Sequence, residues 1–259
     1  MNIGTAKPTP SELLAAPHHF INHLSVEEDY SVGDFEKEAL EVLQNIFSEK
    51  KVAILAGGSG LFIKALCEGL DEFPEVPPKI KNDIEAILEK EGIEVLQREL
   101  EESDPEYFTI VDQQNPMRLI RALSVIRASG KPFSFFRNQE KKPRPFIPIY
   151  INLHWDRVEL YERINKRVDL MIEAGLVEEA KRLISHKNKN ALQTVGYQEL
   201  FDFFDKKITF EEAVNMIKQN SRRYAKRQMT WYRKDNHWKA FHPIQVDEIV
   251  AHIDTQMQD

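Results

Sequence analysis

The sequence predicts an α/β fold with a helical insertion. Two apolar runs, residues 51–56 and 146–153, are typical of buried strands, and each is followed by an amphipathic helical pattern. Between them, residues 74–142 carry helical patterns throughout, and proline-rich sequences flank that stretch. We therefore expect residues 1–73 and 143–259 to form a core with a parallel sheet, and residues 74–142 to form an α-helical insertion domain.

Amphipathic helical patterns account for most of the chain. Apolar residues recur every three or four positions, which places them on one helix face. Asn115 and Pro116 are typical of a helix start, while Gly130 and Gly175 are typical of helix ends. In chain order we expect helices after Ser11, over 35–46, 61–66, 80–88, 95–100, 116–129, 156–174 and 177–186, from 197, and over 213–234 and 246–253. A proline-broken linker is expected at 141–145 and an edge strand within 236–241.

Composition limits the class of protein. A chain of 259 residues with 42% hydrophobic content can bury a full core. Cys67 is its only cysteine, which excludes an internal disulfide and a cysteine-cluster metal site and fits a reducing compartment. No apolar run approaches the ~18–20 residues of a membrane span, and the N-terminus has no signal segment. We expect a cytoplasmic protein without membrane contact, and a monomer.

One basic stretch stands out in a chain whose net charge is −7. Residues 213–234 contain seven lysines and arginines and no carboxylate. On a helix, Arg222 and Lys226 lie four positions apart, as do Arg223 and Arg227, and such like-charge pairs are unfavourable in isolation. Their accumulation indicates a bound polyanion such as phosphate, although a solvated basic face explains the pattern equally well. Neighbouring aromatic residues favour nucleic acid, because aromatic rings stack on bases.

Two further patterns have weaker chemical meaning. The glycine-rich turn at 57–60 follows an expected strand and precedes a helix, so its N–H groups and the Ser59 hydroxyl can face an anion. It matches neither the GxxxxGK[ST] nor the GxGxxG pattern. His19 and His23 are four positions apart, but no HExxH context accompanies them, and we interpret both as packing or surface histidines.

Five separated sequences together resemble one enzyme family. They are IGTAKP at 3–8, GGSGL at 57–61, NPMRLIRAL at 115–123, QTVGY at 193–197 and AKRQMTWYR at 225–233. Their content and order resemble those of the tRNA dimethylallyltransferases, also called tRNA isopentenyltransferases. A single match of this kind would be weak, whereas five in the family's order cover nearly the whole chain.

The resemblance implies a P-loop NTPase-like core and a specific reaction. A dimethylallyl group would pass from dimethylallyl diphosphate to N6 of the adenosine 3′ to the tRNA anticodon, with Mg²⁺ on the diphosphate. It implies that Ser59 holds the target adenine as the catalytic residue, and it provides no protein ligand for the metal. The residues expected at the diphosphate are Thr5, Lys7, Arg118, Arg121, Lys226 and Arg227.

The remaining implied residues bind the anticodon stem-loop of tRNA. They are Lys81, Met117, Leu119, Gln193, Gly196, Tyr197, Gln198, Gln228, Thr230, Trp231 and Arg233. We expect the arginine pair of the insertion and the basic stretch near the C-terminus to converge on a single anionic pocket.

The chain also departs from the family pattern. In the family, the GTAKP sequence follows a strand, a GxxxxGK[ST] loop and an Asp-Ser motif that carries the general base. None of these is among the 259 residues, so we expect a core without its first strand, P-loop and catalytic aspartate, and little or no transferase activity. Asn22 also replaces the family's usual aspartate.

Three alternatives remain open. The chain is a noncatalytic tRNA-binding remnant, or a prenyltransferase that acts on free adenine nucleotides as in the related adenylate family. The third alternative is a P-loop nucleotide kinase, which the lack of a phosphate loop also disfavours.

Overall fold

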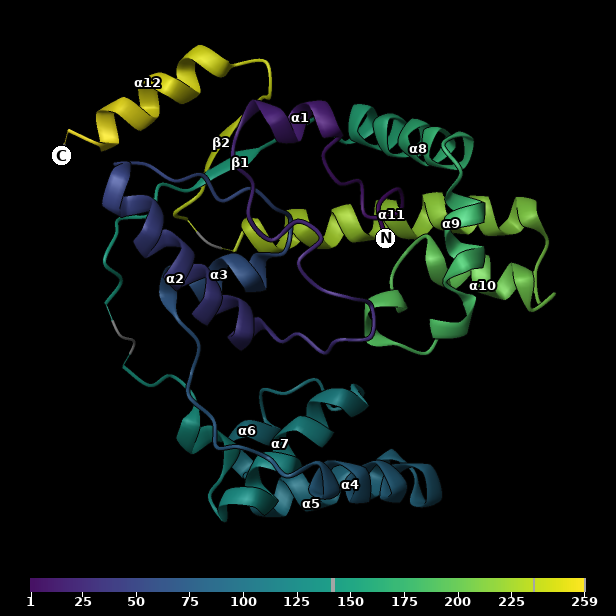
Figure 1. Cartoon of the computed structure of the whole chain (residues 1–259). Coiled ribbons are helices and arrows are strands. Elements are labelled where there is room, and N and C mark those ends of the chain that lie inside the picture. Colours follow the sequence, from purple (N-terminus) through teal and green to yellow (C-terminus); the bar gives the residue numbers. More distant parts are fainter. Residues whose placement is uncertain (141–142, 235, 259) are drawn as a thin grey trace. The chain divides into compact units, whose positions relative to one another are not determined.

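The computed structural model describes residues 1–140, 143–234 and 236–258 (Figure 1). The chain divides into two compact units. The first combines Met1–Cys67 with Pro145–Asp259, and the second is Glu68–Arg144. Lys141 and Lys142, which belong to the expected linker, lie outside the described residues.

The second unit is a helical bundle. It contains α4 (Pro78–Glu91), α5 (Ile93–Ser103), α6 (Pro105–Phe108), α7 (Pro116–Ser129) and the 3-10 helix η1 (Phe133–Phe136). Asn115 caps α7 by accepting the Arg118 N–H, and Gly130, with φ of 69°, ends it. The α7 helix packs against both α4 and α5. The buried core is formed by Ile84, Leu96, Leu100, Val111, Leu119, Ile120, Ala122, Leu123, Val125 and Phe133.

The buried Asp104 side chain links the start of α6 to η1. Asp104 accepts hydrogen bonds from the Tyr107 N–H at 3.0 Å, the Ser134 N–H at 2.7 Å and the Ser134 hydroxyl at 2.8 Å. A buried charge is tolerated only when hydrogen bonds replace its water shell, so these contacts explain why Asp104 can be 1% exposed.

The first unit is built around α11 (Phe210–Tyr232), its longest helix. Figure 1 shows α11 crossing this unit, and it packs against α8 (Arg157–Glu173) and α10 (Tyr197–Phe204). The other elements are α1 (Pro10–Ala15), α2 (Val32–Glu49), α3 (Gly60–Glu68), α9 (Leu176–Arg182), η2 (Ile184–His186), η3 (Asn190–Leu192) and α12 (Val246–Gln256). Their main core comprises Val168, Leu176, Ala180, Leu192, Tyr197, Leu200, Phe201, Ala213 and Ile217.

A small parallel sheet completes the first unit. Strand β1 (Ile151–Leu153) pairs with β2 (Lys239–Phe241), and Asn152 lies opposite Ala240. Backbone hydrogen bonds from Lys239 to Tyr150 at 3.0 Å and from His154 to Phe241 at 2.8 Å continue the ladder. The chain is therefore a helix-rich α/β protein with a small parallel sheet, which confirms the predicted class at this level.

The strand predicted at residues 51–56 is wrong, because this segment has no strand structure. The strand predicted at 146–153 forms only over its last three residues. The side chains of Ile54 and Ile147 are 91% and 88% exposed. Apolar residues favour a strand only when a neighbouring strand satisfies the backbone, and among the described residues only β1 and β2 pair.

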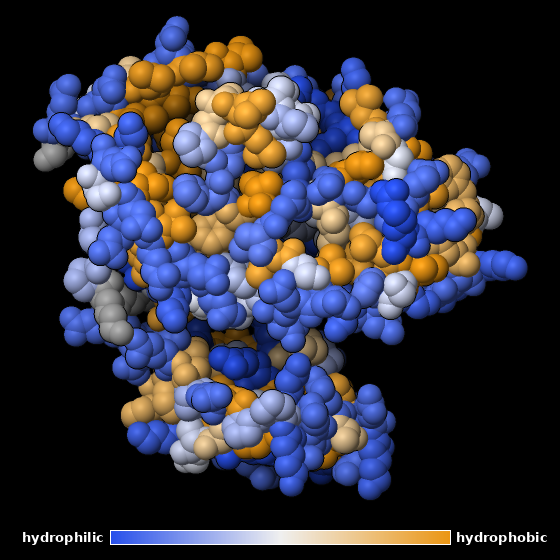
Figure 2. Space-filling model, viewed as in Figure 1, coloured by the Kyte–Doolittle hydropathy of each residue, from blue (hydrophilic) through white to orange (hydrophobic). Residues whose placement is uncertain are grey.

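The surface mixes hydrophobic and hydrophilic side chains in both units (Figure 2). Such mixing is usual, because polar atoms cannot cover a whole protein surface. Of the helices that the structure describes, none has both the length and the hydrophobicity to cross a membrane.

Candidate functional site

The α11 helix presents two chemically different faces. Thr209 caps its start, and the Glu212 side chain returns a hydrogen bond to the Thr209 N–H at 2.7 Å. Ala213, Ile217 and Ala225 are buried against the unit. The cationic side chains Arg223, Lys226 and Arg227 are exposed on other faces. The apolar face of α11 thus packs against the first unit, and the cationic side chains on its other faces remain exposed to solvent.

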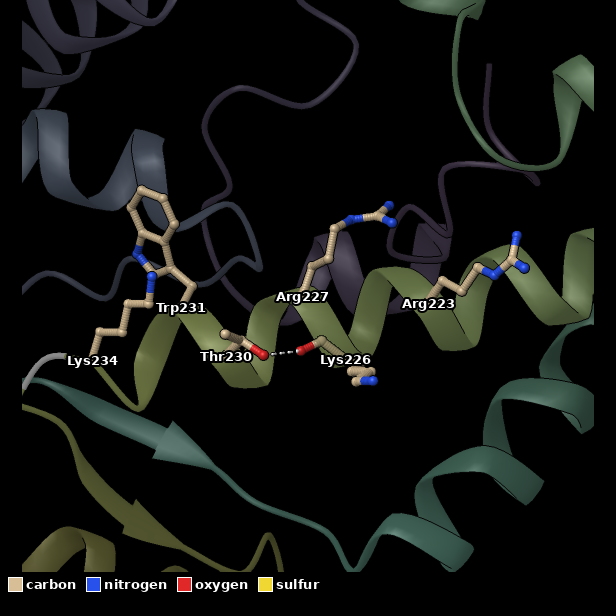
Figure 3. A pocket seen from close by; sticks show the side chains of 6 residues that line it. All are labelled: Arg223, Lys226, Arg227, Thr230, Trp231 and Lys234. Carbon is tan, nitrogen blue, oxygen red and sulfur yellow. Dashed lines mark hydrogen bonds between the residues drawn. The ribbon is translucent and has the colours of Figure 1, made fainter. Parts of the chain in front are cut away.

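An open cavity of about 440 Å³ lies along the C-terminal half of α11 (Figure 3). In Figure 3, the side chains of Arg223, Arg227 and Trp231 extend to the same side of the helix, as expected for residues four positions apart. We call the lining residues the basic groove: Arg223, Lys226, Arg227, Thr230, Trp231 and Lys234.

Two cations of the basic groove contact neutral groups. Arg223 donates to the Asn220 side-chain oxygen at 3.3 Å, and the Arg227 guanidinium lies 5.6 Å from the centre of the Tyr224 ring. The lining residues that the structure describes include four cations and no carboxylate. Such a surface carries positive potential and suits an anionic ligand. Thr230 donates its hydroxyl to the Lys226 carbonyl at 2.9 Å, so this hydroxyl is already engaged.

The glycine-rich turn packs against the same end of α11. The Gln228 side-chain amide donates to the Gly58 carbonyl at 2.8 Å. A Cβ added at Gly60 would lie 2.1 Å from Nε1 of Trp231, so only glycine fits beneath this indole without movement. Ser59 lies between these two contacts, and its side chain is exposed just before α3. The tertiary structure therefore brings the GGSG and KRQMTW sequences together.

The N-terminal segment is attached to a buried carboxylate. Glu179 of α9 is 6% exposed and accepts the N–H groups of Asn2, Ile3 and Gly4 at 2.8, 3.1 and 3.1 Å. The Tyr197 hydroxyl donates to it at 2.5 Å. Burial alone raises the pKa of Glu179, but the hydrogen bonds from Tyr197 and from the backbone outweigh it and lower the pKa to about 2. Sequence analysis missed Glu179, which belongs to none of the five motifs.

Thr5 and Lys7 lie just beyond this anchored segment. Thr5 is exposed, and its hydroxyl is 3.2 Å from the carbonyl oxygens of Met1 and Asn2. The Lys7 ammonium donates to the Asn22 side-chain oxygen. Burial lowers the pKa of Lys7, and the negative charge of Glu179 opposes that effect. Both side chains come from a backbone that is held in place by residues far along the chain.

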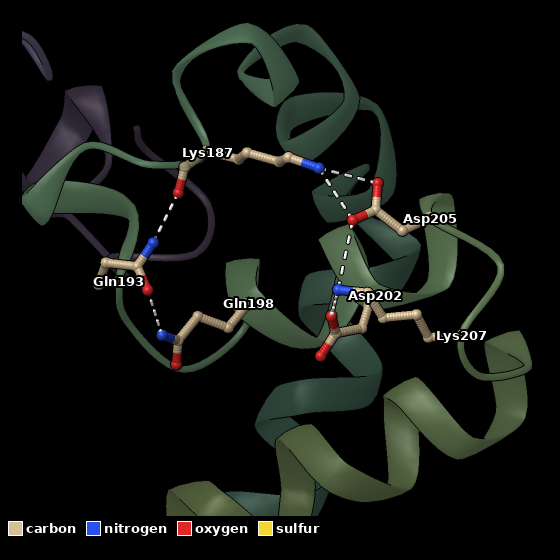
Figure 4. Close-up of polar contacts among 6 residues, drawn as sticks. All are labelled: Lys187, Gln193, Gln198, Asp202, Asp205 and Lys207. Atoms are coloured by element: carbon tan, nitrogen blue, oxygen red, sulfur yellow. Dashed lines mark hydrogen bonds and ion pairs between the residues drawn. The ribbon is translucent and has the colours of Figure 1, made fainter. Parts of the chain in front are cut away.

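The QTVGY sequence separates into an exposed part and a buried part. Figure 4 shows Gln193 donating to the Lys187 carbonyl and accepting from the Gln198 amide, with both distances 2.7 Å. Both glutamines are exposed. Gly196 and Tyr197 are buried, and Tyr197 has no exposed surface. The two glutamines are therefore accessible to a ligand, whereas Tyr197 packs inside the unit. In the same region, Lys187 and Lys207 both form ion pairs with Asp205.

The second unit holds five of the predicted residues. Arg118 and Met117 are exposed at the start of α7, and the guanidinium of Arg121 lies 5.3 Å from the centre of the Phe73 ring. Lys81 is exposed and lies 3.5 Å from Glu85. Leu119 is fully buried in the core, so its side chain supports the helix instead of facing a ligand.

The last predicted residue, Arg233, is exposed at the C-terminal end of α11. Of the residues that the structure describes, no group of three histidine, cysteine, aspartate or glutamate side chains could hold a metal ion. The donor set of the basic groove therefore suits phosphate oxygens and does not suit direct metal ligation.

Comparison with known proteins identifies relatives across the chain. The family model described as IPP transferase matches residues 1–235. A tRNA dimethylallyltransferase of Christiangramia forsetii is 55% identical over 241 residues, which are 93% of this chain and 80% of that protein. A second, from Cytophaga hutchinsonii, is 45% identical over 259 residues, which cover 100% of this chain and 85% of the relative.

Solved structures are similar as well. A tRNA isopentenylpyrophosphate transferase of Bacillus halodurans is 32% identical with a TM-score of 0.68, over 99% of this chain and 82% of that one. A eukaryotic dimethylallyltransferase acting on tRNA is 25% identical with a TM-score of 0.76, over 94% of this chain and 65% of that one.

Proposed function

Because the chain belongs to the IPP transferase family, we propose that it is a tRNA dimethylallyltransferase. It transfers the dimethylallyl group of dimethylallyl diphosphate to N6 of the adenosine that follows the anticodon. The observation that carries this proposal is the contact between the GGSG turn and α11, made by Gln228 and Trp231 beside the basic groove.

The basic groove supplies the charge that this reaction needs. Cleavage of the allylic carbon–oxygen bond leaves its electron pair on the diphosphate, so negative charge grows in the transition state. Fixed cations stabilise that charge more strongly than they stabilise the bound substrate. Lys226 and Arg227 are our candidates on α11, with Thr5 and Lys7 from the N-terminal segment. Arg118 and Arg121 are proposed as further phosphate contacts.

Ser59 is proposed to hold the target adenine. The adenine must leave its stack before N6 can attack the allylic carbon, which costs a few kcal/mol and less in a loop. Ser59 is exposed and directly precedes Gly60, which packs beneath the Trp231 indole, so a hydrogen-bonding hydroxyl and an aromatic ring come from neighbouring positions. As N6 bonds to carbon it loses one proton, and a base must accept it. We assign that base to none of the described residues.

The anticodon stem-loop is bound chiefly through shape and phosphate contacts. Exposed residues are proposed for direct contact: Lys81, Met117, Gln193, Gln198, Thr230, Trp231 and Arg233. Gln228 acts through its hydrogen bond to Gly58, and the buried Leu119, Gly196 and Tyr197 act by packing. Mg²⁺, which members of the family generally require, would be held by the diphosphate oxygens.

We also propose that these 259 residues alone transfer the group slowly. They include no GxxxxGK[ST] sequence, and removing a single oxyanion donor from an active site typically costs about 10²–10³ in rate. The test compares this chain with one extended upstream by a family segment that carries GxxxxGK[ST] and Asp-Ser. Transfer to an anticodon stem-loop is followed by mass spectrometry of the modified adenosine.

We expect transfer by the extended chain and little by the 259 residues. Full transfer by the shorter chain would refute the slow-rate proposal. Stem-loop binding without transfer by either form would indicate a noncatalytic tRNA-binding protein. Stronger competition from AMP than from a second stem-loop would indicate a prenyltransferase of free nucleotides.

A further inference from the structure

The backbone of the N-terminal segment forms an anion-binding concavity around Glu179. Three consecutive N–H groups, those of Asn2, Ile3 and Gly4, point at its carboxylate. Successive amides of this kind normally form a nest for a bound anion. Here the anion is a side chain of α9, and the Tyr197 hydroxyl provides the fourth donor. The carboxylate therefore holds the segment through three hydrogen bonds, and the Tyr197 hydroxyl holds the carboxylate.

Tyr197 also shapes the backbone above it. A Cβ added at Gly4 would lie 2.6 Å from the ring and hydroxyl of Tyr197, so the backbone approaches this ring as closely as glycine permits. Ala6 has φ of 48°, which is unfavourable for a residue with a side chain. Hydrogen bonds from Ala6 N to the Ile3 carbonyl at 3.0 Å and from Lys7 N to the Asn2 carbonyl at 3.3 Å maintain this conformation.

The hydrogen bonds between Glu179 and residues 2–4 determine the positions of Thr5 and Lys7. Thr5 and Lys7 follow Gly4, the last of the hydrogen-bonded amides, by one and three positions. If those amides moved, both side chains would move with them. A carboxylate near a diphosphate would repel it, but four hydrogen bonds disperse the charge of Glu179 and orient it toward the protein backbone. Its chemistry therefore suits holding the segment and does not suit touching the substrate.

We propose that Glu179, together with Tyr197, is a positioning residue of the transfer reaction. It fixes the segment so that Thr5 and Lys7 receive the diphosphate, and in this respect the inference rests on the proposed function. Glu179 and the Tyr197 hydroxyl act on binding of the allylic donor and not on binding of tRNA, to which Tyr197 contributes only through the packing of its ring. A residue that only stabilised the fold would weaken both.

The test uses Glu179→Gln, which keeps the size of the side chain and places an NH₂ donor against backbone donors. Hydrogen–deuterium exchange reports the amides of residues 2–4. Calorimetry measures binding of dimethylallyl diphosphate, and fluorescence anisotropy measures binding of an anticodon stem-loop. We expect faster exchange and donor binding about 10- to 100-fold weaker, since a hydrogen bond to a charged group typically contributes about that factor to an equilibrium constant. Stem-loop affinity should remain within about twofold.

Two matched variants accompany it. Glu178→Gln removes the same charge from the adjacent, exposed position of α9 and should change none of the three measurements. Tyr197→Phe removes one of the four donors, keeps the ring beneath Gly4, and should weaken donor binding to a smaller extent. If Glu179→Gln does not fold, Tyr197→Phe alone decides the question.

The possible outcomes separate this inference from the proposed function. Unchanged exchange in the variants, or faster exchange with unchanged donor binding, would overturn the positioning role. Equal weakening of donor and stem-loop binding would also overturn it, because it would indicate a general structural role. If the unmodified chain bound neither ligand, the proposed function would fail, while the exchange data would still show whether Glu179 holds the segment.

Discussion

The Gln228 side chain donates a hydrogen bond to the Gly58 carbonyl at 2.8 Å, which joins residues 170 positions apart. One partner belongs to the glycine-rich turn and the other to the basic helix α11. Neither sequence alone has a strong chemical meaning. Their contact places an exposed serine, an indole and a row of cations within one small region of the first unit.

Loss of this hydrogen bond should reduce both stability and transfer. Gln228→Leu replaces the amide by a slightly shorter apolar side chain and leaves the Gly58 carbonyl without its donor. We expect the free energy of unfolding to fall by about 1 kcal/mol, measured by urea denaturation, with slower prenyl transfer by the extended chain. Gln219→Leu, at an exposed position of α11, is the control. Equal effects of the two substitutions would contradict the role of the contact.

Gly60→Ala should displace Trp231. The added methyl group would meet the rigid indole at 2.1 Å, so the ring or the turn must move, at a cost of about 1–3 kcal/mol. Tryptophan fluorescence and thermal unfolding would both report the change. Gly57→Ala is the matched control, because a Cβ at Gly57 meets nothing within 4 Å. A Gly60→Ala protein with unaltered fluorescence and stability would show that the close approach does not exist.

Arg233→Ala should weaken anticodon stem-loop binding in a salt-dependent way, because Arg233 is exposed at the C-terminal end of α11 and is one of the proposed stem-loop contacts. The logarithm of the affinity falls linearly with the logarithm of the salt concentration. Each lost contact between a cation and a phosphate makes that fall less steep by about 0.7–0.9. Anisotropy titrations at several salt concentrations measure that slope. Lys50→Ala removes an equal charge at the exposed C-terminal end of α2 and should leave the slope unchanged. The same loss of slope in both variants would indicate a general charge effect instead of a defined phosphate contact.

Glu179 should make stability depend on pH in acid. Its pKa is lowered from 4.5 to about 2, so between these values the folded protein binds fewer protons at this carboxylate than the unfolded chain does. Its stabilising contribution is therefore fully present above pH 4.5 and is lost as the pH falls toward 2. Glu179→Gln cannot titrate.

Urea unfolding of both proteins at several pH values between about 3 and 6 measures this contribution. The stability difference between wild type and Glu179→Gln should be largest near the upper end of that range and should shrink toward the lower end. A difference that stays constant with pH would mean that Glu179 has an ordinary pKa in the folded state.

Local sequence patterns predicted much of the fold. The cap at Asn115 and the glycines at 130 and 175 mark helix ends that the structure confirms, and the expected edge strand within 236–241 forms as Lys239–Phe241. These features depend on neighbouring residues, which is why pattern analysis finds them. The apolar run at 51–56 failed, because a strand requires a partner that its own residues do not specify.

By itself, the sequence determined the family, through five motifs in a fixed order, and it determined the helical frame through apolar spacing. Only the tertiary structure decided that Leu119 and Tyr197 are buried supports, that the GGSG turn contacts α11, and that Glu179 holds the N-terminal segment. The physical reason is that each of these facts depends on packing between segments far apart in the chain. Helical periodicity tells which face of a helix is apolar, but it does not tell which distant segment that face will meet.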